Sequence, residues 1–399
     1  MSRATLLASL AFLAFISLGL PDGLLGVSWP SISRGFDVAL DNLGLVAAAT
    51  TAGYLTSSFL GGAILRHVSL GMVLAASTLA AALALLGFAA APAFPPLLVL
   101  GVLAGLGGGA VDAGLNAYGA RHFSARTLNW LHAFFGLGTT LGPLIVTGVL
   151  SAGLSWRLSY VIVGVAQLAL AATFLATRAR WAEDPEAIAA AEEAAPDMPD
   201  ASTWATLRRP SVWLGMGLFF FYSGIEMATA QWSYSLMTLE RGIDPTRAGV
   251  FVTLYWGSLM VGRVLFGLIA DRVPLVPVLR GCMILALLGA LLFWLQPTPA
   301  LALAGLMGIG FFLAPIFASL VAMTPERVGR AHADSAIGFQ IASAGLGGAV
   351  LVALTGWATR IWGLGVIGIA IVLFAALLWA FYEGFIRRTA RRMNLSDPA

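Results

Sequence analysis

The chain carries very little charge for its length. Only 10% of its 399 residues are Asp, Glu, Lys or Arg, and lysine is absent altogether. Soluble domains have about a quarter of their residues charged. This composition therefore excludes a cytosolic enzyme, a disordered protein and a nucleic-acid-binding module. The net charge of +3 comes from arginine, and we attribute it to loops that flank membrane helices.

Cysteine is nearly absent as well. The single cysteine, Cys282, excludes a disulfide framework and the usual cysteine zinc sites. The histidines are scattered through the chain, and no metal-ligand cluster, nucleophile elbow or nucleotide-binding loop is visible. The sequence therefore predicts no cofactor, no metal site and no catalytic residue.

Long apolar runs dominate the composition, which is 59% hydrophobic. A helix needs about 20 apolar residues to cross a bilayer, and the runs of that length fall into two sets of six. The first set is 5–28, 42–64, 70–90, 96–120, 128–151 and 156–178. The second set is 211–238, 247–270, 276–295, 299–323, 334–356 and 361–386. We expect the first run to remain as a helix, because it is too long for a signal peptide and no A-x-A-like cleavage site interrupts it.

A polar, acidic segment from Arg178 to Pro210 separates the two sets. It has too little apolar surface to fold as a domain. We therefore predict an N-terminal six-helix bundle at 1–178, a cytoplasmic linker at 179–210, and a C-terminal six-helix bundle with a cytoplasmic tail at 211–399.

Arginine is unevenly divided between the two sides of the predicted spans. With the N-terminus inside, the outer segments hold Arg34, Arg157, Arg241, Arg247 and Arg360. The inner segments hold most of the others, including Arg66, Arg121, Arg126, Arg178, Arg180, Arg208, Arg209, Arg327, Arg330, Arg387, Arg388, Arg391 and Arg392. Because cytoplasmic loops retain positive charge, both termini and the linker are predicted to be cytoplasmic.

The two halves also resemble each other. Arg34-Gly35-Phe36-Asp37 follows the first predicted helix, and Arg241-Gly242-Ile243-Asp244 follows the seventh, about 207 positions later. Gly61 and Arg66 correspond to Gly267 and Arg272 at nearly the same offset. Repeated six-helix halves are an arrangement of transporters, whose binding site lies near the membrane midplane. We therefore predict an all-α membrane protein with twelve transmembrane helices in two pseudo-symmetric six-helix bundles.

Three acidic residues lie inside predicted spans: Asp22, Asp112 and Glu226. A charge within the hydrocarbon costs at least a few kcal/mol, so such residues are candidates for function. In the alternative, purely structural interpretation, each carboxylate caps a broken helix or pairs with a buried arginine. Asp22 follows Pro21, where we expect a broken turn. We assign proton coupling to Asp22 and Asp112.

Polar side chains accompany these acids on shared helix faces. Asp112 and Asn116 are four residues apart, in line with Gly105 and Gly109, so they lie on one face of a helix. The other candidate substrate-binding residues are Asn129, His132, Glu226, Gln231, Trp232, Trp256 and Gln340. Glu226 and Trp232 would face different ways on a regular helix, so both can line one cavity only if that helix is interrupted. Ordinary packing explains a lone histidine or a glycine stripe without function.

The end of the eighth predicted helix carries a G-x-x-x-D-R pattern in Gly267, Asp271 and Arg272, preceded by Gly262 and Arg263. With this pattern the chain resembles the major facilitator superfamily, whose members repeat it after the second helix. Leu65 stands where that first copy has aspartate, although Gly61 and Arg66 match.

Within the superfamily the chain is similar to the fucose, galactose and glucose proton-symporter group and its relatives. The matching residues are Asp112 and Asn116, Leu128-Asn129-Trp130-Leu131-His132, Tyr222-x-Gly224-x-Glu226 with Trp232, and Gly262-Arg263. His132 and Glu226 stand where the fucose carrier has amides.

The resemblance implies a major facilitator fold that works by alternating access, moving a hexose-type sugar with protons. It implies a bacterial cytoplasmic (inner) membrane location, a monomer, and a gate formed by Gly262, Arg263, Gly267, Asp271 and Arg272. The first alternative is a proton-driven exporter of drugs or other hydrophobic compounds, which would have a more aromatic pocket with fewer amides. The second alternative is a membrane enzyme or a non-transporting receptor or sensor.

Overall fold

In the computed structural model the described residues are 3–182, 202–296 and 298–396, and all their regular structure is helical. Among these residues, twelve helices are long and apolar enough to cross a membrane. The predicted all-α protein with twelve spans is thereby confirmed. Residues 183–201, which make up most of the predicted linker, lie outside the described residues.

The chain forms two compact units. Unit 1 comprises Met1–Pro196 with Ser233–Gly257, and unit 2 comprises Asp197–Trp232 with Ser258–Ala399. The helices α9 (Pro210–Ser235) and α10 (Pro245–Ile269) therefore contribute residues to both units. The predicted boundaries at 178 and 210 stay a prediction.

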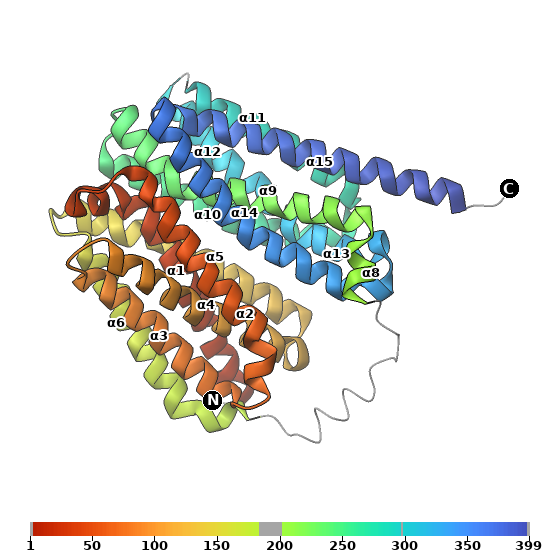
Figure 1. The fold of residues 1–399 in the computed structure, drawn as a ribbon, viewed down its shortest axis with the longest axis horizontal. Coiled ribbons are helices and arrows are strands. Elements are labelled where there is room, and N and C mark those ends of the chain that lie inside the picture. Colours follow the sequence, from red (N-terminus) through yellow and green to blue (C-terminus); the bar gives the residue numbers. More distant parts are fainter. Residues whose placement is uncertain (1–2, 183–201, 297, 397–399) are drawn as a thin grey trace. The chain divides into compact units, whose positions relative to one another are not determined.

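Unit 1 is built from paired helices. Its elements before α9 are α1 (Arg3–Phe36), η1 (Leu40–Asn42), α2 (Leu43–Leu65), α3 (Leu70–Ala90), α4 (Pro95–His122), α5 (Ala125–Ser151), α6 (Arg157–Thr177) and η2 (Arg178–Trp181). The helix α1 pairs with α5, α2 with α4, and α3 with both α4 and α6 (Figure 1). The π-helical segment η3 (Leu236–Glu240) follows α9 and also belongs to this unit.

Glycine allows the closest of these pairs to form. On α5, a Cβ added at Gly138 would meet the carbonyl of Ile16 on α1. On α4, a Cβ at Gly105 would meet the carbonyl of Thr50 on α2. Membrane helices associate through small residues, because water cannot drive apolar surfaces together within lipid. The glycine stripe predicted on α4 is thus the surface that α2 packs against.

The second unit follows the same packing rules. Besides its part of α9 and α10 it contains α8 (Thr203–Leu207), η4 (Ala270–Arg272), α11 (Leu275–Leu295), α12 (Pro299–Leu313), α13 (Ile316–Val328), η5 (Arg330–His332), α14 (Ala333–Trp362) and α15 (Val366–Ser396). The helix α11 packs against α12 and α15. A two-point ion pair joins α11 to α15, with Arg280 Nε 2.5 Å and Nη2 3.1 Å from the Glu383 carboxylate oxygens.

One local expectation was wrong, because the helix α1 continues through Pro21 to Phe36 and Asp22 does not follow a broken turn. The helix α9 runs unbroken from Pro210 to Ser235, so the interruption that Glu226 and Trp232 would need to line one cavity does not occur. The predicted tenth helix is one candidate span, Pro299–Val328, with a short break at Ala314 and Pro315 between α12 and α13.

Candidate functional site

The most connected predicted residues lie around Asp112 in unit 1. Its Oδ2 accepts a hydrogen bond from the Tyr54 hydroxyl at 2.5 Å, and its Oδ1 accepts one from the Asn116 amide at 2.9 Å. Both oxygens of the half-buried carboxylate therefore have a donor. The i,i+4 relation of Asp112 and Asn116 that the sequence predicts is present as a direct contact.

The packing of α2 on α4 brings Tyr54 to Asp112. A Cβ at Gly109 would meet the Tyr54 carbonyl, and a Cβ at Gly105 would meet the Tyr54 backbone nitrogen. The two glycines precede Asp112 by one and two helical turns on the same face. The α2 backbone at Tyr54 thus lies against the glycine stripe, and its phenol reaches Asp112.

Two more predicted residues interact with this pair. His132 on α5 interacts electrostatically with Asp112, and its ring meets Phe15 of α1 edge-on at 5.5 Å between centroids. Asp22 on α1 interacts electrostatically with Tyr54. Asp112, Asn116 and Tyr54 are therefore in direct contact, and Asp22 and His132 are in range of an electrostatic interaction with this group. Asn129 lies on α5, but its side chain lies outside the described residues.

A second polar group lies in unit 2. The Arg263 Nη2 on α10 lies 3.4 Å and 3.5 Å from the two carboxylate oxygens of Glu226 on α9, and 3.2 Å from the Tyr222 hydroxyl. Arg263 was predicted to belong to the gate, and the structure places it with Glu226. A lone buried carboxylate would be costly, and the guanidinium offsets that cost.

The remaining predicted binding residues are in the protein interior. The Trp232 indole N–H donates to the Val352 carbonyl of α14 at 3.0 Å. Gln340 Oε1 accepts a hydrogen bond from Thr324 of α13 at 2.9 Å. Gln231 and Trp256 are buried, with at most 2% of their surface exposed. These contacts are helix-packing contacts.

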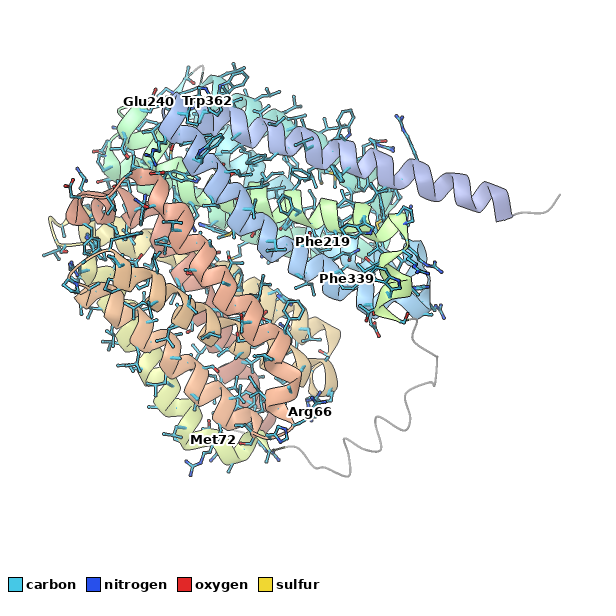
Figure 2. The ribbon with its side chains drawn as sticks, in the orientation of Figure 1. Arg66, Met72, Phe219, Glu240, Phe339 and Trp362 are labelled. Atoms are coloured by element: carbon cyan, nitrogen blue, oxygen red, sulfur yellow. The ribbon has the colours of Figure 1, made fainter. Side chains whose placement is uncertain are left out.

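The helix α14 presents its polar stripe to α9. The Ser343 hydroxyl donates to the Met216 carbonyl at 2.8 Å, and a Cβ at Gly347 would meet the Phe220 backbone. Phe219 on α9 and Phe339 on α14 belong to this same unit (Figure 2). Gln340, which a Cβ at Gly215 of α9 would meet, therefore lies with Ser343 and Gly347 on a helix interface.

The residues of the predicted gate are dispersed. A Cβ at Gly262 would meet the Phe311 carbonyl of α12, which makes this glycine a packing residue. Gly267 has open space around it, and Arg272 is exposed. Asp271 lies in η4, but its side chain lies outside the described residues.

Unit 1 also holds a cavity of about 220 Å³, at the end where Figure 2 labels Arg66 and Met72. Its lining is Leu65, Ser69, Leu70, Gly114, Arg121, Trp181 and Ala182. Neither Asp112 nor Tyr54 contributes to it.

Sequence reasoning missed Tyr54 and gave Tyr222 no role of its own. Both tyrosines place a hydroxyl against a carboxylate or its arginine partner inside a candidate span. The sequence feature that could have identified both residues is a tyrosine within an apolar run. Its partner could not be read from the sequence, because the partner lies on a different helix.

Comparisons with known proteins agree with this architecture. The model of the Major Facilitator Superfamily matches residues 8–239 and 214–394. The glucose/mannose transporter GlcP of Bacillus subtilis is 24% identical over 367 residues, covering 90% of this chain and 88% of that protein. The 3-(3-hydroxy-phenyl)propionate transporter of Escherichia coli is 26% identical over 363 residues, covering 89% and 85%. A bacterial homologue of the human lysosomal transporter Spinster, solved in an inward-facing and unoccupied conformation, has a TM-score of 0.80 at 12% identity and 98% coverage of both chains.

Proposed function

The chain belongs to the Major Facilitator Superfamily, and from this premise we propose that it moves a hexose-type sugar by alternating access, coupled to a proton gradient. As a member of that family it is an integral membrane transporter with twelve spans and not an enzyme. It is a secondary transporter that binds a small molecule within the membrane.

One observation carries the proposal of proton coupling. Asp112 is a carboxylate inside a candidate span, and the donors that contact it, Tyr54 and Asn116, are both neutral. Proton uptake by this carboxylate therefore breaks no ion pair of the kind that joins Glu226 to Arg263, and His132 interacts with it electrostatically. Asp22, which interacts with Tyr54, serves as an auxiliary acceptor in this account.

Hydrogen-bonding groups support a polar solute. Sugar hydroxyls are bound by carboxylates and amides, and a site built for them rejects molecules that leave those groups unpaired. Asn116, Asn129, His132 and Glu226 are the proposed contacts, and Gln231, Trp256 and Gln340 are proposed to shape the site. Trp232 was predicted with them, but on the unbroken helix α9 it faces a different way from Glu226 and cannot line the same cavity. The formal charges of Glu226 and Arg263 cancel, which favours a neutral solute. The named substrates of the relative GlcP, glucose and mannose, are of this kind.

The arginine distribution supports cytoplasmic termini. The bacterial relatives support a location in a bacterial inner membrane. Gly267, Asp271 and Arg272, with Gly262 and Arg263 before them, form the proposed cytoplasmic gate. We propose that the chain works as a monomer.

Uptake into proteoliposomes tests the proposed function. Radiolabelled hexoses are offered to the full-length protein with and without a proton gradient, acid outside. Unlabelled neutral hexoses, hexuronates, aromatic acids and lipophilic dyes compete in parallel, and protein-free liposomes give the background. We expect accumulation of a hexose only with the gradient, and competition by neutral hexoses. Competition by aromatic acids or dyes, with no hexose uptake, would contradict the assignment.

A further inference from the structure

The hydrogen bonds around Asp112 bear on how it binds a proton. Tyr54 donates to one carboxylate oxygen at 2.5 Å and Asn116 donates to the other at 2.9 Å. Donors of this kind stabilise the charged form of a carboxylate relative to its neutral form. The two donors differ in origin, because Asn116 is on the same helix as Asp112 whereas Tyr54 is on α2.

We propose that Tyr54 is a positioning residue for proton coupling, whose hydroxyl donates to the Asp112 carboxylate and thereby sets the pH at which Asp112 takes up a proton. This inference rests on the coupling role proposed for Asp112. A proton from the aqueous phase binds a carboxylate oxygen and neutralises it. The new carboxyl O–H then donates to the phenol oxygen, which is both a donor and an acceptor. Tyr54 keeps its own proton throughout.

Helix packing fixes Tyr54 for this task. The α2 backbone at Thr50 and Tyr54 lies against Gly105 and Gly109, where a Cβ would clash. The phenol is therefore held by two contacts of its own backbone and does not depend on a flexible loop. Any movement of α2 along α4 would alter the donor set of Asp112 while leaving the Asn116 contact in place.

The other helices packed around Asp112 bring two further titratable groups near it. The helix α5 contributes His132, which interacts electrostatically with Asp112. The helix α1 contributes Asp22, which interacts with Tyr54. The helix α3, also packed on α4, has no titratable side chain in Leu70–Ala90. Tyr54 reaches Asp112 from another helix, and its hydroxyl donates a hydrogen bond of 2.5 Å to the Asp112 carboxylate.

Infrared titration of the purified full-length protein tests the proposal without any transported solute. The carbonyl band of protonated Asp112 is identified as the band that disappears in Asp112→Asn. Its intensity against pH gives the midpoint of proton uptake. In Tyr54→Phe, which removes one hydroxyl and keeps the ring, we expect this midpoint to rise by about one to two pH units, because a hydrogen bond to the charged form is lost.

Tyr160→Phe is the matched control. It removes another buried phenol hydroxyl of unit 1, which pairs with Ser28 at 3.1 Å, and we expect the wild-type midpoint. An unchanged midpoint in Tyr54→Phe, or an equal rise in Tyr160→Phe, overturns the proposal. A second measurement uses the wild-type protein with its tyrosines replaced by 3-fluorotyrosine, which is more acidic and a stronger hydrogen-bond donor. The pH midpoint of Asp112 protonation should fall in this protein. An unchanged midpoint would also overturn the proposal.

This titration separates the positioning role from the proposed function. If hexose uptake fails in proteoliposomes but the midpoint rises in Tyr54→Phe, the sugar assignment is wrong and the role of Tyr54 stands. If hexose uptake is proton-driven but the midpoint of Asp112 protonation does not change in Tyr54→Phe, the proposed function stands and the role of Tyr54 is wrong.

Discussion

At the scale of single residues, Asp112 and Glu226 differ in the charge of the groups that donate hydrogen bonds to them. Asp112 receives hydrogen bonds from Tyr54 and Asn116, which are neutral. Glu226 faces the Arg263 guanidinium at 3.4 Å. The Glu226 carboxylate is thus one half of an ion pair, and its loss would leave the partly exposed Arg263 guanidinium without this partner. Asp112 is therefore better suited to exchange protons, and Glu226 to hold a fixed charge near the solute.

A substitution at Glu226 tests this division. We expect Glu226→Gln to lower hexose affinity at least tenfold, because the fixed carboxylate acceptor is lost, and calorimetry on purified protein measures it. Glu383→Gln is the matched control, since it breaks the ion pair with Arg280 in the same unit. Equal hexose affinities in the two variants would show that Glu226 does not bind the solute.

The sequence predicts contacts within one helix and misses those between helices. Asp112 and Asn116 could be paired because i,i+4 geometry is fixed by the helix itself. Tyr54 could not be assigned, since its contact depends on which helix packs against α4. Trp232 shows the same limit, because its partner Val352 is 120 positions away.

At the scale of helices, glycine sets the distance between α2 and α4. The α4 positions 105 and 109 face α2 backbone atoms, where any side chain would collide. This contact positions Tyr54, so helix packing and the chemistry at Asp112 depend on the same glycines. Hydropathy predicted the spans well, but the extension of α1 to Phe36 and the division at Pro315 are local backbone features that average apolarity does not report.

Gly105→Ala should therefore destabilise the protein. The added methyl group would force α2 away from α4, and overpacking of this kind costs about 1–3 kcal/mol. Gly62→Ala adds the same methyl group on α2, where nothing lies within 4 Å. Thermal unfolding in detergent should show a lower melting temperature for Gly105→Ala alone. If both variants melt together, the close contact is not required for stability.

At the scale of the whole molecule, transport requires the family's alternation between access states. The predicted gate around Asp271 biases that equilibrium in our account. A mutation that acts only on the gate changes the populations of states, whereas solute affinity within each state stays the same.

We expect Asp271→Ala to enlarge the inward-open population. Spin labels at Ser69 and Arg330, both exposed, would be introduced with Cys282 replaced by serine, and distance distributions would be measured by electron paramagnetic resonance. Asp334→Ala, at an exposed carboxylate in the first turn of α14, is the control. Identical distance distributions in Asp271→Ala and wild type would show that the G-x-x-x-D-R pattern marks the end of a helix and has no role in gating.

Solute-induced proton movement is the most direct test of proton-coupled transport through Asp112. Hexose is added to de-energised proteoliposomes, and the external pH is recorded for wild type and for Asp112→Asn. Hexose counterflow is measured on the same preparations. We predict external alkalinisation with wild type, none with Asp112→Asn, and counterflow in both, because exchange needs the conformational change without net proton release. Alkalinisation that persists in Asp112→Asn, or its absence in wild type that performs counterflow, would contradict the account.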